Sequence, residues 1–418
     1  MQTPTDAESP SNSTRDLTGH YKRILQSGAA ARSGVEGVSD PDGGEPDLSE
    51  GGIRDRVDMI RAELKRIVDQ HLYGKPGLHE LAERIVDGAD EALRVLRDED
   101  EQRLRERPDV LDSLEAVVRT DGSRPSFMIR NGEVDRTTSP LGAWADALDT
   151  SANMLRDAIS CVGRIDIPSA VHGFEGTGFL IQDNLLATNR HVLQAVARRE
   201  NDGTWILKQD VTIDFGHEFR ARESVSRRAL RRVIFAGSKP ILEAGPVDHK
   251  KLDLALIELV PGAPEDLPRA PLSLDMAGDW AAPDISVYTL GYPAKPGVGT
   301  YPPTLLEQLF QMTFGCKRLA PGKIMRSRLE IHTWTLAHDA TTLGGNSGSV
   351  ILVVGREYAA VGLHYGGRRG EPRENWGVVL GRVLDETDGR PDVTLRQCLR
   401  ENGVHLIDRV GGGTPSDA

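Results

Sequence analysis

The sequence predicts an all-β domain of two β-barrels, preceded by an N-terminal α-helical extension. Two observations lead to this prediction. Between residues 161 and 406, short β-forming runs alternate with turns, and no strong helical period separates them. Between residues 53 and 105, apolar residues instead recur at helical spacing, with charges between them. The chain of 418 residues is long enough for both units.

The N-terminal part divides by composition. Residues 1–50 are rich in Ser, Gly, Pro and Asp, and we expect them to be mostly disordered, as is the tail at 409–418. Helices are expected over residues 53–72 and from 78 to about 105, with Gly74, Pro76 and Pro108 as breaks. They form either a helical hairpin that packs on its neighbour or a module that recruits a protein. Residues 51–157 are therefore assigned to a mainly helical regulatory or adaptor region.

Two smaller elements are expected before the β-rich part. Residues 124–136 predict a hairpin, because Asn131-Gly132 suits a two-residue turn that needs positive φ at both positions. A short helix is expected over residues 141–159. Residues 158–408 then form the β domain, with predicted strands VGRIDI, GTGFLI, DVTIDF, LALIEL, ISVYTLGY, RLEIHTW, SVILVV and AAVGLHY.

Composition excludes several classes of function. The net charge of −12 argues against nucleic acid as a partner. No apolar run approaches the roughly 18 residues that span a membrane. The N-terminus lacks a secretory signal, and three widely separated cysteines indicate a reduced, cytoplasmic protein. The histidines and cysteines fall at no metal-ligand spacing, so neither a metal nor a cofactor is expected.

Three segments of the β-rich part each carry one reactive side chain. His191 follows a strand in LATNRHV, Asp253 opens the apolar run LDLALI, and Ser347 lies in GGNSGSV. A hydroxyl nucleophile, a base near pKa 7 and a carboxylate that orients the base are the parts that peptide hydrolysis needs. Each segment alone is an ordinary strand end or loop, but the three together predict a catalytic triad. Backbone amides of Gly345 and Ser347 are the expected donors of an oxyanion hole.

These segments resemble the trypsin/chymotrypsin superfamily, in its bacterial, disulfide-poor branch. The resemblance covers about residues 160–400 and implies the chymotrypsin-like double barrel and a serine endopeptidase that needs no cofactor. Asn346 stands where the digestive enzymes have the Asp that pairs with a freshly cut N-terminal amine. Activation by that ion pair is therefore not expected.

The segment TTLGGNSGS and the later GLHYGG are similar to motifs of the glutamyl endopeptidases, with Leu343 as an extra residue. This resemblance implies that Thr342 and His364 line the primary specificity pocket. His364 is then either a residue that selects acidic P1 side chains or a plain pocket wall. The strand 360–363 is expected to pair with substrate backbone, with Gly362 in the substrate-binding set and Gly366 at the pocket mouth.

Two further features leave alternatives open. Thr341 falls at the position of trypsin's basic-specificity Asp, which argues against Arg/Lys preference, although Asp339 is near. A run of arginines on this acidic chain is either a solvated hairpin face or a surface that recruits an acidic partner; it comprises Arg220, Arg222, Arg227, Arg228, Arg231 and Arg232.

We therefore expect a serine endopeptidase that acts on protein or peptide substrates through an acyl-enzyme on Ser347. The helical extension would regulate it or recruit a regulatory protein partner, and it loosely resembles adaptor regions of bacterial stress or defence peptidases. The rival predictions are a peptide-binding module of the same fold that does not cut, and an esterase.

Overall fold

The computed structural model describes most of the chain beyond residue 45. The described residues are 18–19, 21–22, 25, 46–71, 78–120, 124–139, 141–220, 227–242, 246–262, 270–297, 306, 310–327, 329–356, 358–368 and 374–408. Residues 1–50 and 409–418, which were predicted to be disordered, lie almost entirely outside the described residues. Of the helices in this part of the chain, none has the length and hydrophobicity needed to cross a bilayer.

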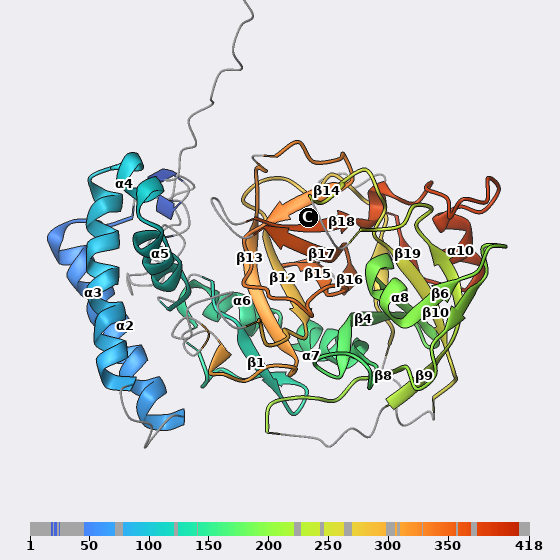
Figure 1. The fold of residues 1–418 in the computed structure, drawn as a ribbon, viewed down its shortest axis with the longest axis horizontal. Helices are drawn as coiled ribbons and strands as arrows, with labels where there is room; N and C mark the ends of the chain where they lie inside the picture. Colours follow the sequence, from blue (N-terminus) through green and yellow to red (C-terminus); the bar gives the residue numbers. More distant parts are fainter. Residues whose placement is uncertain are drawn as a thin grey trace, which may run out of the picture.

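The N-terminal helices pack on one another at one end of the molecule (Figure 1). They are α2 (Glu50–His71), α3 (Leu78–Arg97), α4 (Glu101–Glu106) and α5 (Pro108–Thr120). Their shared core includes Ile60, Leu93 and Leu114. The two predicted helices are present, but the second one stops at Arg97, because Glu99 has a left-handed φ of 53°. Helix α5 was not predicted. It begins at Pro108, because proline is well suited to the first position of a helix.

The first barrel closes in the strand order β10-β5-β4-β3-β8-β9. Its strands are β3 (Val162–Asp166), β4 (Phe174–Gln182), β5 (Leu185–Thr188), β8 (Thr212–Asp214), β9 (Arg227–Ala236) and β10 (Ala255–Leu259). After β5 the chain forms helix α8 (Arg190–Val196) and then a hairpin of β6 (Ala197–Arg199) and β7 (Trp205–Leu207). The predicted runs VGRIDI, GTGFLI, DVTIDF and LALIEL all lie in this barrel.

The second barrel closes in the order β12-β15-β17-β18-β14-β13, with β13 paired back to β12. Its strands are β12 (Ser286–Gly291), β13 (Arg318–Met325), β14 (Thr335–His338), β15 (Val350–Val353), β17 (Gly362–Arg368) and β18 (Glu374–Val379). The predicted double barrel is therefore confirmed. The run RLEIHTW was predicted as a strand, but its described residues, 329–334, do not form one. A turn from His332 to Thr335 follows instead and leads into β14, which starts only at Thr335.

Smaller elements cover the barrels. β11 (Ser273–Asp275) pairs in parallel with β16 (Ala359–Ala360) and β19 (Leu406–Ile407). The short helices are η1 (Gly142–Trp144), α6 (Ala145–Thr150), α7 (Ala152–Cys161), η3 (Leu380–Arg382) and α10 (Leu395–Glu401). The helix predicted over residues 141–159 is thus three short pieces, with a break at Ser151.

The barrel unit reaches further toward the N-terminus than residue 158, where the sequence placed its start. The predicted Asn131-Gly132 hairpin is present as β1 (Phe127–Arg130) and β2 (Glu133–Val134), and β1 pairs with β13. Side chains from residues 127–159 share one apolar core with the barrels. Arg124 also forms a bidentate ion pair with Asp339, at 2.7 Å for both bonds. The unit packed around the barrels therefore begins near Arg124.

Among the described residues, an apolar contact joins the helical unit to the second barrel. Ile85 of α3 packs against a small buried cluster formed by Leu306, Phe310 and Leu343. Ile85 also packs against the core of the helical unit. Leu343 stands four residues before Ser347, so this contact reaches the loop that carries the predicted nucleophile.

Candidate active site

His191 and Asp253 form a hydrogen-bonded pair. The Nδ1 atom of His191 lies 2.6 Å from one carboxylate oxygen of Asp253, and the His191 backbone N–H donates to the other oxygen at 2.9 Å. Asp253 is buried, whereas the His191 side chain stays partly exposed. A buried carboxylate on Nδ1 fixes the ring orientation and leaves Nε2 for a proton transfer.

Local structure positions both residues. His191 lies in the first turn of α8, directly after β5, and Asp253 precedes β10, which pairs with β5. The buried amide of Asn189 donates to the Asp253 carbonyl at 2.9 Å and joins the two strand ends. Buried Leu252 and Leu254 anchor Asp253 on both sides. The two reactive side chains therefore meet because the strands that carry them are neighbours.

Ser347 is brought to this pair from the second barrel. The Thr177 N–H donates to the Ser347 carbonyl at 2.8 Å, and the Thr177 hydroxyl donates to the Gly345 carbonyl at 2.8 Å. A Cβ on Gly176 would lie 2.7 Å from Val192 and 2.9 Å from the Ser347 carbonyl oxygen. Only glycine therefore lets β4, helix α8 and the Ser347 loop meet at this point.

The loop around Ser347 presents two unused backbone donors. Gly345 has φ +85°, and a Cβ there would lie 2.6 Å from the Tyr292 carbonyl oxygen. Gly348 has φ +90°, and its Cβ would lie 1.8 Å from the Thr177 carbonyl oxygen. Within the described part of the chain, the amides of Gly345 and Ser347 donate to no acceptor. This is the arrangement that an oxyanion requires.

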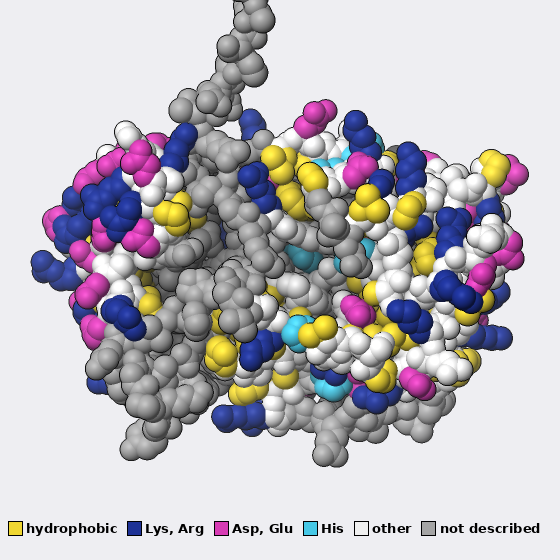
Figure 2. All heavy atoms as spheres, viewed as in Figure 1, with side chains coloured by type: hydrophobic (Ala, Val, Ile, Leu, Met, Phe, Trp, Pro, Cys, Tyr) yellow, Lys and Arg dark blue, Asp and Glu magenta, His cyan; other side chains and the backbone are white. Residues whose placement is uncertain are grey.

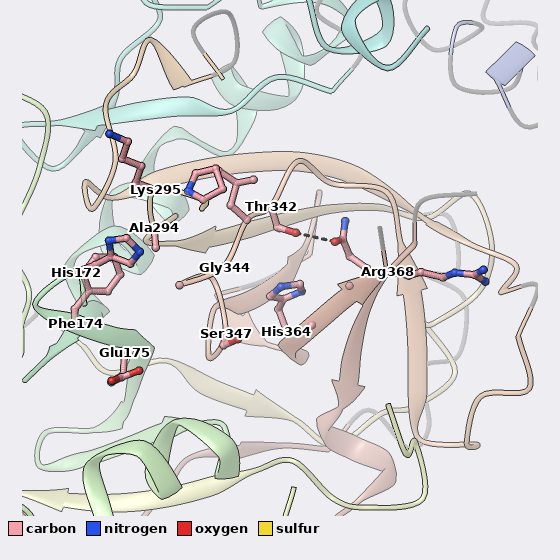
Figure 3. Close-up of a pocket in the computed structure, with 16 residues that line it drawn as sticks. His172, Phe174, Glu175, Ala294, Lys295, Thr342, Gly344, Ser347, His364 and Arg368 are labelled. Atoms are coloured by element: carbon pink, nitrogen blue, oxygen red, sulfur yellow. Dashed lines mark hydrogen bonds between the residues drawn. The ribbon is translucent and has the colours of Figure 1, made fainter. Parts of the chain in front are cut away.

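A cavity of about 390 Å³ opens beside Ser347. In Figure 3, His172, Phe174 and Glu175 lie on one side of Ser347, and Thr342 and His364 lie on the other. The predicted pocket residues Thr342, His364 and Gly366 all line this cavity. Gly362 does not: it is buried, and a Cβ there would contact the Val378 carbonyl oxygen at 3.1 Å inside the barrel. Gly362 therefore lies away from the cavity, unlike the other three predicted pocket residues.

The strand edge expected to pair with substrate is also displaced. Gly362 and Leu363 are paired on both sides, with β15 and with β18, so the predicted edge at residues 360–363 is closed. His364 is still hydrogen-bonded on the other side, to Gly348 and Ser349, but from Gly366 to Arg368 β17 pairs with β18 alone. Gly366 and Gly367 line the cavity on this part of the strand. The edge that can take an extended peptide therefore lies after His364.

His364 meets a second buried histidine that the sequence analysis did not connect with the site. The Nε2 atom of His338 lies 3.1 Å from Nδ1 of His364, and His338 Nδ1 has no partner among the described residues. A buried lone pair without a partner costs less than a buried N–H without one. We therefore place the His338 proton on Nε2, which puts the proton of His364, a residue that lines the cavity, on its own Nε2 atom.

Burial keeps both imidazoles neutral. It lowers the pKa of His338 to about 4. Burial, with the neighbouring His338 and His191, lowers the pKa of His364 well below its usual value. The Thr342 hydroxyl donates to Asn375 at 2.8 Å, and Asn375 in turn donates to the Ala340 carbonyl at 2.7 Å. His364 is therefore the hydrogen-bond donor that this wall offers to a ligand.

A trypsin-like pocket would need an acidic group at the cavity, and the nearby candidate Asp339 is already paired elsewhere. Asp339 is occupied by Arg124 and also accepts the Lys323 N–H at 2.7 Å. The Thr341 hydroxyl donates to the Arg124 carbonyl at 2.7 Å. Neither residue lines the cavity.

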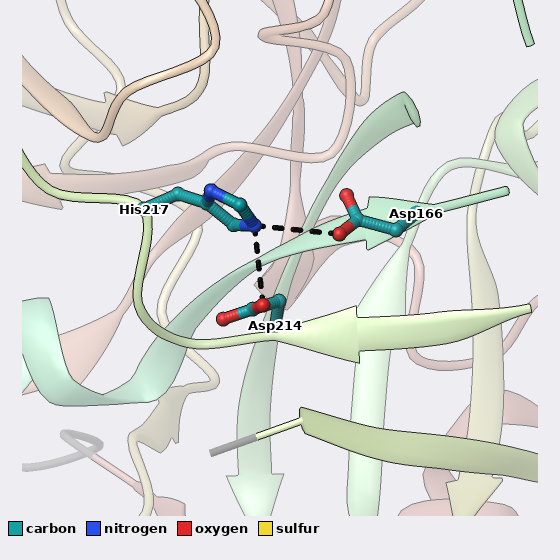
Figure 4. Close-up of side chains that lie close together, drawn as sticks. All are labelled: Asp166, Asp214 and His217. Carbon is teal, nitrogen blue, oxygen red and sulfur yellow. Dashed lines mark ion pairs between the residues drawn. The ribbon is translucent and has the colours of Figure 1, made fainter. Parts of the chain in front are cut away.

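Asp166, Asp214 and His217 form a cluster whose ligand atoms lie within 4.8 Å of one another (Figure 4). The sequence spacing did not predict it, because strand pairing between β3 and β8 brings the residues together. Arg164 donates to Asp166 at 2.6 Å, and Arg227 lies 3.3 Å from Asp214. Because these guanidinium groups already balance both carboxylates, we interpret the cluster as an ion-pair network and not as a metal site.

Comparison with known proteins agrees with this geometry. Residues 176–363 match the trypsin-like peptidase domain family. A probable serine protease of Lysobacter enzymogenes is 30% identical over 278 residues, which cover 62% of this chain and 70% of that protein.

Solved structures similar to the chain are more distant. Neuropsin, a serine protease of mouse brain, has 15% sequence identity and a TM-score of 0.37, and the match covers 54% of this chain and 92% of neuropsin. The Rv3671c protease of M. tuberculosis, in an inactive form, has 18% identity and a TM-score of 0.32, with 60% and 93% covered.

The relative, the matched domain and the two six-stranded barrels agree with one another. The chain belongs to the trypsin-like serine peptidase family and is a serine endopeptidase with the chymotrypsin fold.

Proposed function

We propose that His191, Asp253 and Ser347 are the catalytic residues and that Gly345 and Ser347 supply the oxyanion hole. The observation that carries this proposal is the short contact of 2.6 Å between Nδ1 of His191 and the carboxylate of Asp253. The two unused amides beside Ser347 support it. The substrate is a protein or peptide.

In the proposed reaction, His191 Nε2 takes the Ser347 proton as Oγ bonds to the carbonyl carbon of the substrate. The amides of Gly345 and Ser347 bind the resulting oxyanion, and Asp253 stabilises the imidazolium. His191 then protonates the leaving amine as the peptide bond breaks. A water molecule hydrolyses the acyl-enzyme by the same proton transfers in reverse order.

We also propose that the pocket prefers an acidic P1 side chain. His364 presents an N–H to the cavity, whereas Asp339, the group that would favour a basic P1 residue, is neutralised by Arg124. A bound carboxylate supplies the counter-charge that the two histidines lack, and it therefore raises the pKa of His364. Binding of an acidic P1 residue should then be accompanied by proton uptake.

Three peptides that differ only at P1, with Glu, Gln or Lys, test this preference. We expect kcat/KM in the order Glu, Gln, Lys at mildly acidic pH, and a Glu-to-Gln ratio that falls as pH rises, because the protonated imidazole is lost. The Ser347→Ala variant should cut none of them. Faster cleavage after Lys than after Glu would contradict the acidic preference while leaving the catalytic assignment intact.

The helical unit is the proposed regulator of this site. Ile85 packs between the core of the helices and the cluster of Leu306, Phe310 and Leu343, and Leu343 lines the cavity beside the oxyanion loop. A partner that moves α3 would therefore act on the Gly345 amide through Leu343. The identity of such a partner, a stress or defence context and a cytoplasmic location stay predictions from sequence.

Replacing Ile85 tests this link. Ile85→Asp removes the apolar contact and should slow the labelling of Ser347 by a fluorophosphonate about threefold to tenfold, because the oxyanion donors lose support. Arg84→Asp, at the exposed neighbouring position of α3, is the control and should leave the rate unchanged. Equal rates in the two folded variants would rule out the link.

A further inference from the structure

A second groove lies on the first barrel and contains no residue of the active site. Its volume is about 580 Å³, larger than that of the cavity beside Ser347. The backbone of residues 232–237 forms one side, and the β6–β7 hairpin and the turn at residues 388–390 form the others. Its charged residues are Arg199, Arg232, Arg390, Asp202 and Asp388.

The side of the groove formed by β9 carries backbone groups that are unpaired on the β8 side, and β7 packs near this side. β9 pairs with β10 from Leu230 to Ala236, but it pairs with β8 only through Arg227, Arg228 and Ala229. Beyond Ala229, no strand in the described part of the chain is paired with β9 on the β8 side. An extended peptide that lies in the groove can form hydrogen bonds with these unpaired backbone groups.

The groove carries cationic side chains on a protein whose net charge is −12. Arg199 has no carboxylate partner among the described residues, and its guanidinium lies 5.9 Å from the Trp205 ring. Arg232 shares Glu258 with Arg231, so one carboxylate balances two cations. Arg390 is held by Asp388. Figure 2 shows Lys and Arg side chains spread over the part of the molecule where β6, β9 and β10 lie.

The groove is connected to the catalytic pair through its floor. Arg190, the neighbour of His191, donates to the Gly237 carbonyl at 2.6 Å. A Cβ on Gly237 would lie 2.0 Å from the carbonyl oxygen of Leu252, the neighbour of Asp253. Gly237 therefore touches the residues next to both members of the pair.

We propose that this groove is an exosite for an extended acidic segment of a protein substrate, which lies between β9 and the β6–β7 hairpin. Carboxylates of the segment pair with Arg199 and Arg232, while Asp202 and Asp388 disfavour a continuous phosphate backbone. The proposal rests on the proposed function in one respect, because the occupant is a substrate. It assigns a role to part of the arginine run that the sequence left open.

The test uses the full-length Ser347→Ala protein, so that no peptide is cut. Fluorescence anisotropy measures its binding to a short labelled peptide of alternating Glu and Val. Arg199→Glu and Arg232→Glu should each weaken binding by about tenfold. Arg231→Glu is the matched control: it lies on the same strand and shares Glu258 but does not line the groove, and it should weaken binding by less than about twofold.

Three results would overturn the exosite: no binding of the acidic peptide, an equal loss in the Arg231→Glu control, or equally tight binding of a single-stranded oligonucleotide of the same charge. Each is a binding result with an inactive protein. Failure of the exosite is therefore distinct from failure of the catalytic assignment, which is measured on Ser347 of the wild type.

Discussion

At the scale of single residues, Asp253 is placed to determine which ring nitrogen of His191 carries the proton. One carboxylate oxygen accepts the His191 backbone N–H and the other faces Nδ1. If Asn replaces Asp253, its oxygen can keep the backbone contact, but its NH2 group then faces Nδ1. The imidazole must place its proton on Nε2, where it blocks proton transfer from Ser347.

We therefore expect Asp253→Asn to lower kcat by about ten-thousandfold, with little change in KM. Steady-state kinetics on a peptide substrate, with a thermal melt to confirm folding, provide the measurement. A folded variant whose kcat stays within about tenfold of wild type would show that His191 is oriented by another group.

The two adjacent glycines before Asn346 give a matched pair for the oxyanion hole. Gly345→Ala forces a Cβ to within 2.6 Å of the Tyr292 carbonyl oxygen at φ +85° and should displace the amide donor. The expected loss in kcat is about a hundredfold or more. Gly344→Ala meets nothing within 4 Å and should retain activity. Similar activity of the two variants would contradict the proposed donor.

The residues of the site were predictable to different degrees. His191, Asp253 and Ser347 lie in short local motifs, and the structure brings all three motifs to one place. The position of Gly362 away from the cavity and the contact of His338 with His364 were not predicted, because both depend on strand pairing: β17 turns Gly362 into the barrel, and β14 places His338 beside His364. The spacing of residues along the sequence indicates neither the position of Gly362 nor the contact between His338 and His364.

At the scale of elements, the break between α3 and α4 depends on one residue with an unfavourable backbone. Glu99 has φ 53°, a conformation that glycine adopts without a Cβ clash. Glu99→Gly should therefore stabilise the helical unit by about 0.5–1 kcal/mol, with the lost surface ion pair to Lys22 offsetting a part.

Urea unfolding followed by circular dichroism would measure this change, with Asp98→Gly as the comparison. Asp98 is the adjacent surface residue but does not have positive φ, so glycine there should be destabilising or neutral. Greater stabilisation by Asp98→Gly would refute the backbone argument.

Element boundaries were predicted well where the periodicity was long and poorly where a turn interrupted it. Helix α2 followed from its apolar spacing, whereas α5 was missed because Pro108 was taken only as a break. The run RLEIHTW has strand-like composition, yet the His332–Thr335 turn keeps its described residues out of the ladder. Composition alone does not reveal such a turn.

At the scale of the whole molecule, buried neutral histidines make stability depend on pH. Burial lowers the pKa of His338, His364 and His249, so these groups bind protons more readily in the unfolded chain. Burial opposes the charged form of His217 too, but hydrogen bonds to Asp166 and Asp214 outweigh it and raise its pKa. Three histidines thus favour folding at higher pH and one favours it at lower pH.

The free energy of unfolding should therefore fall as pH decreases from about 6.5 to about 4, as the unfolded histidines become protonated. Urea midpoints across this range provide the measurement. His338→Gln should flatten the dependence, and His217→Gln should steepen it, because that variant removes the opposing contribution. A protein that becomes more stable on acidification would contradict the assignment of neutral buried imidazoles.

The double barrel was predictable as a whole because many short strands at regular spacing leave few alternatives. The start of the barrel unit was not, because the hairpin at β1 and β2 joins β13 across almost two hundred residues of sequence. Nor does the sequence reveal that Ile85 packs against the cluster that contains Leu343, since that contact exists only between packed units.

The central claim is that Ser347 is a nucleophile activated by His191 and Asp253. The most direct measurement is fluorophosphonate labelling of the wild type, Ser347→Ala and His191→Ala proteins, with the modified residue located by mass spectrometry. We predict a single adduct on Ser347 in the wild type and none at that position in either variant. Absence of the adduct in folded wild type, or equal labelling without His191, would contradict the account.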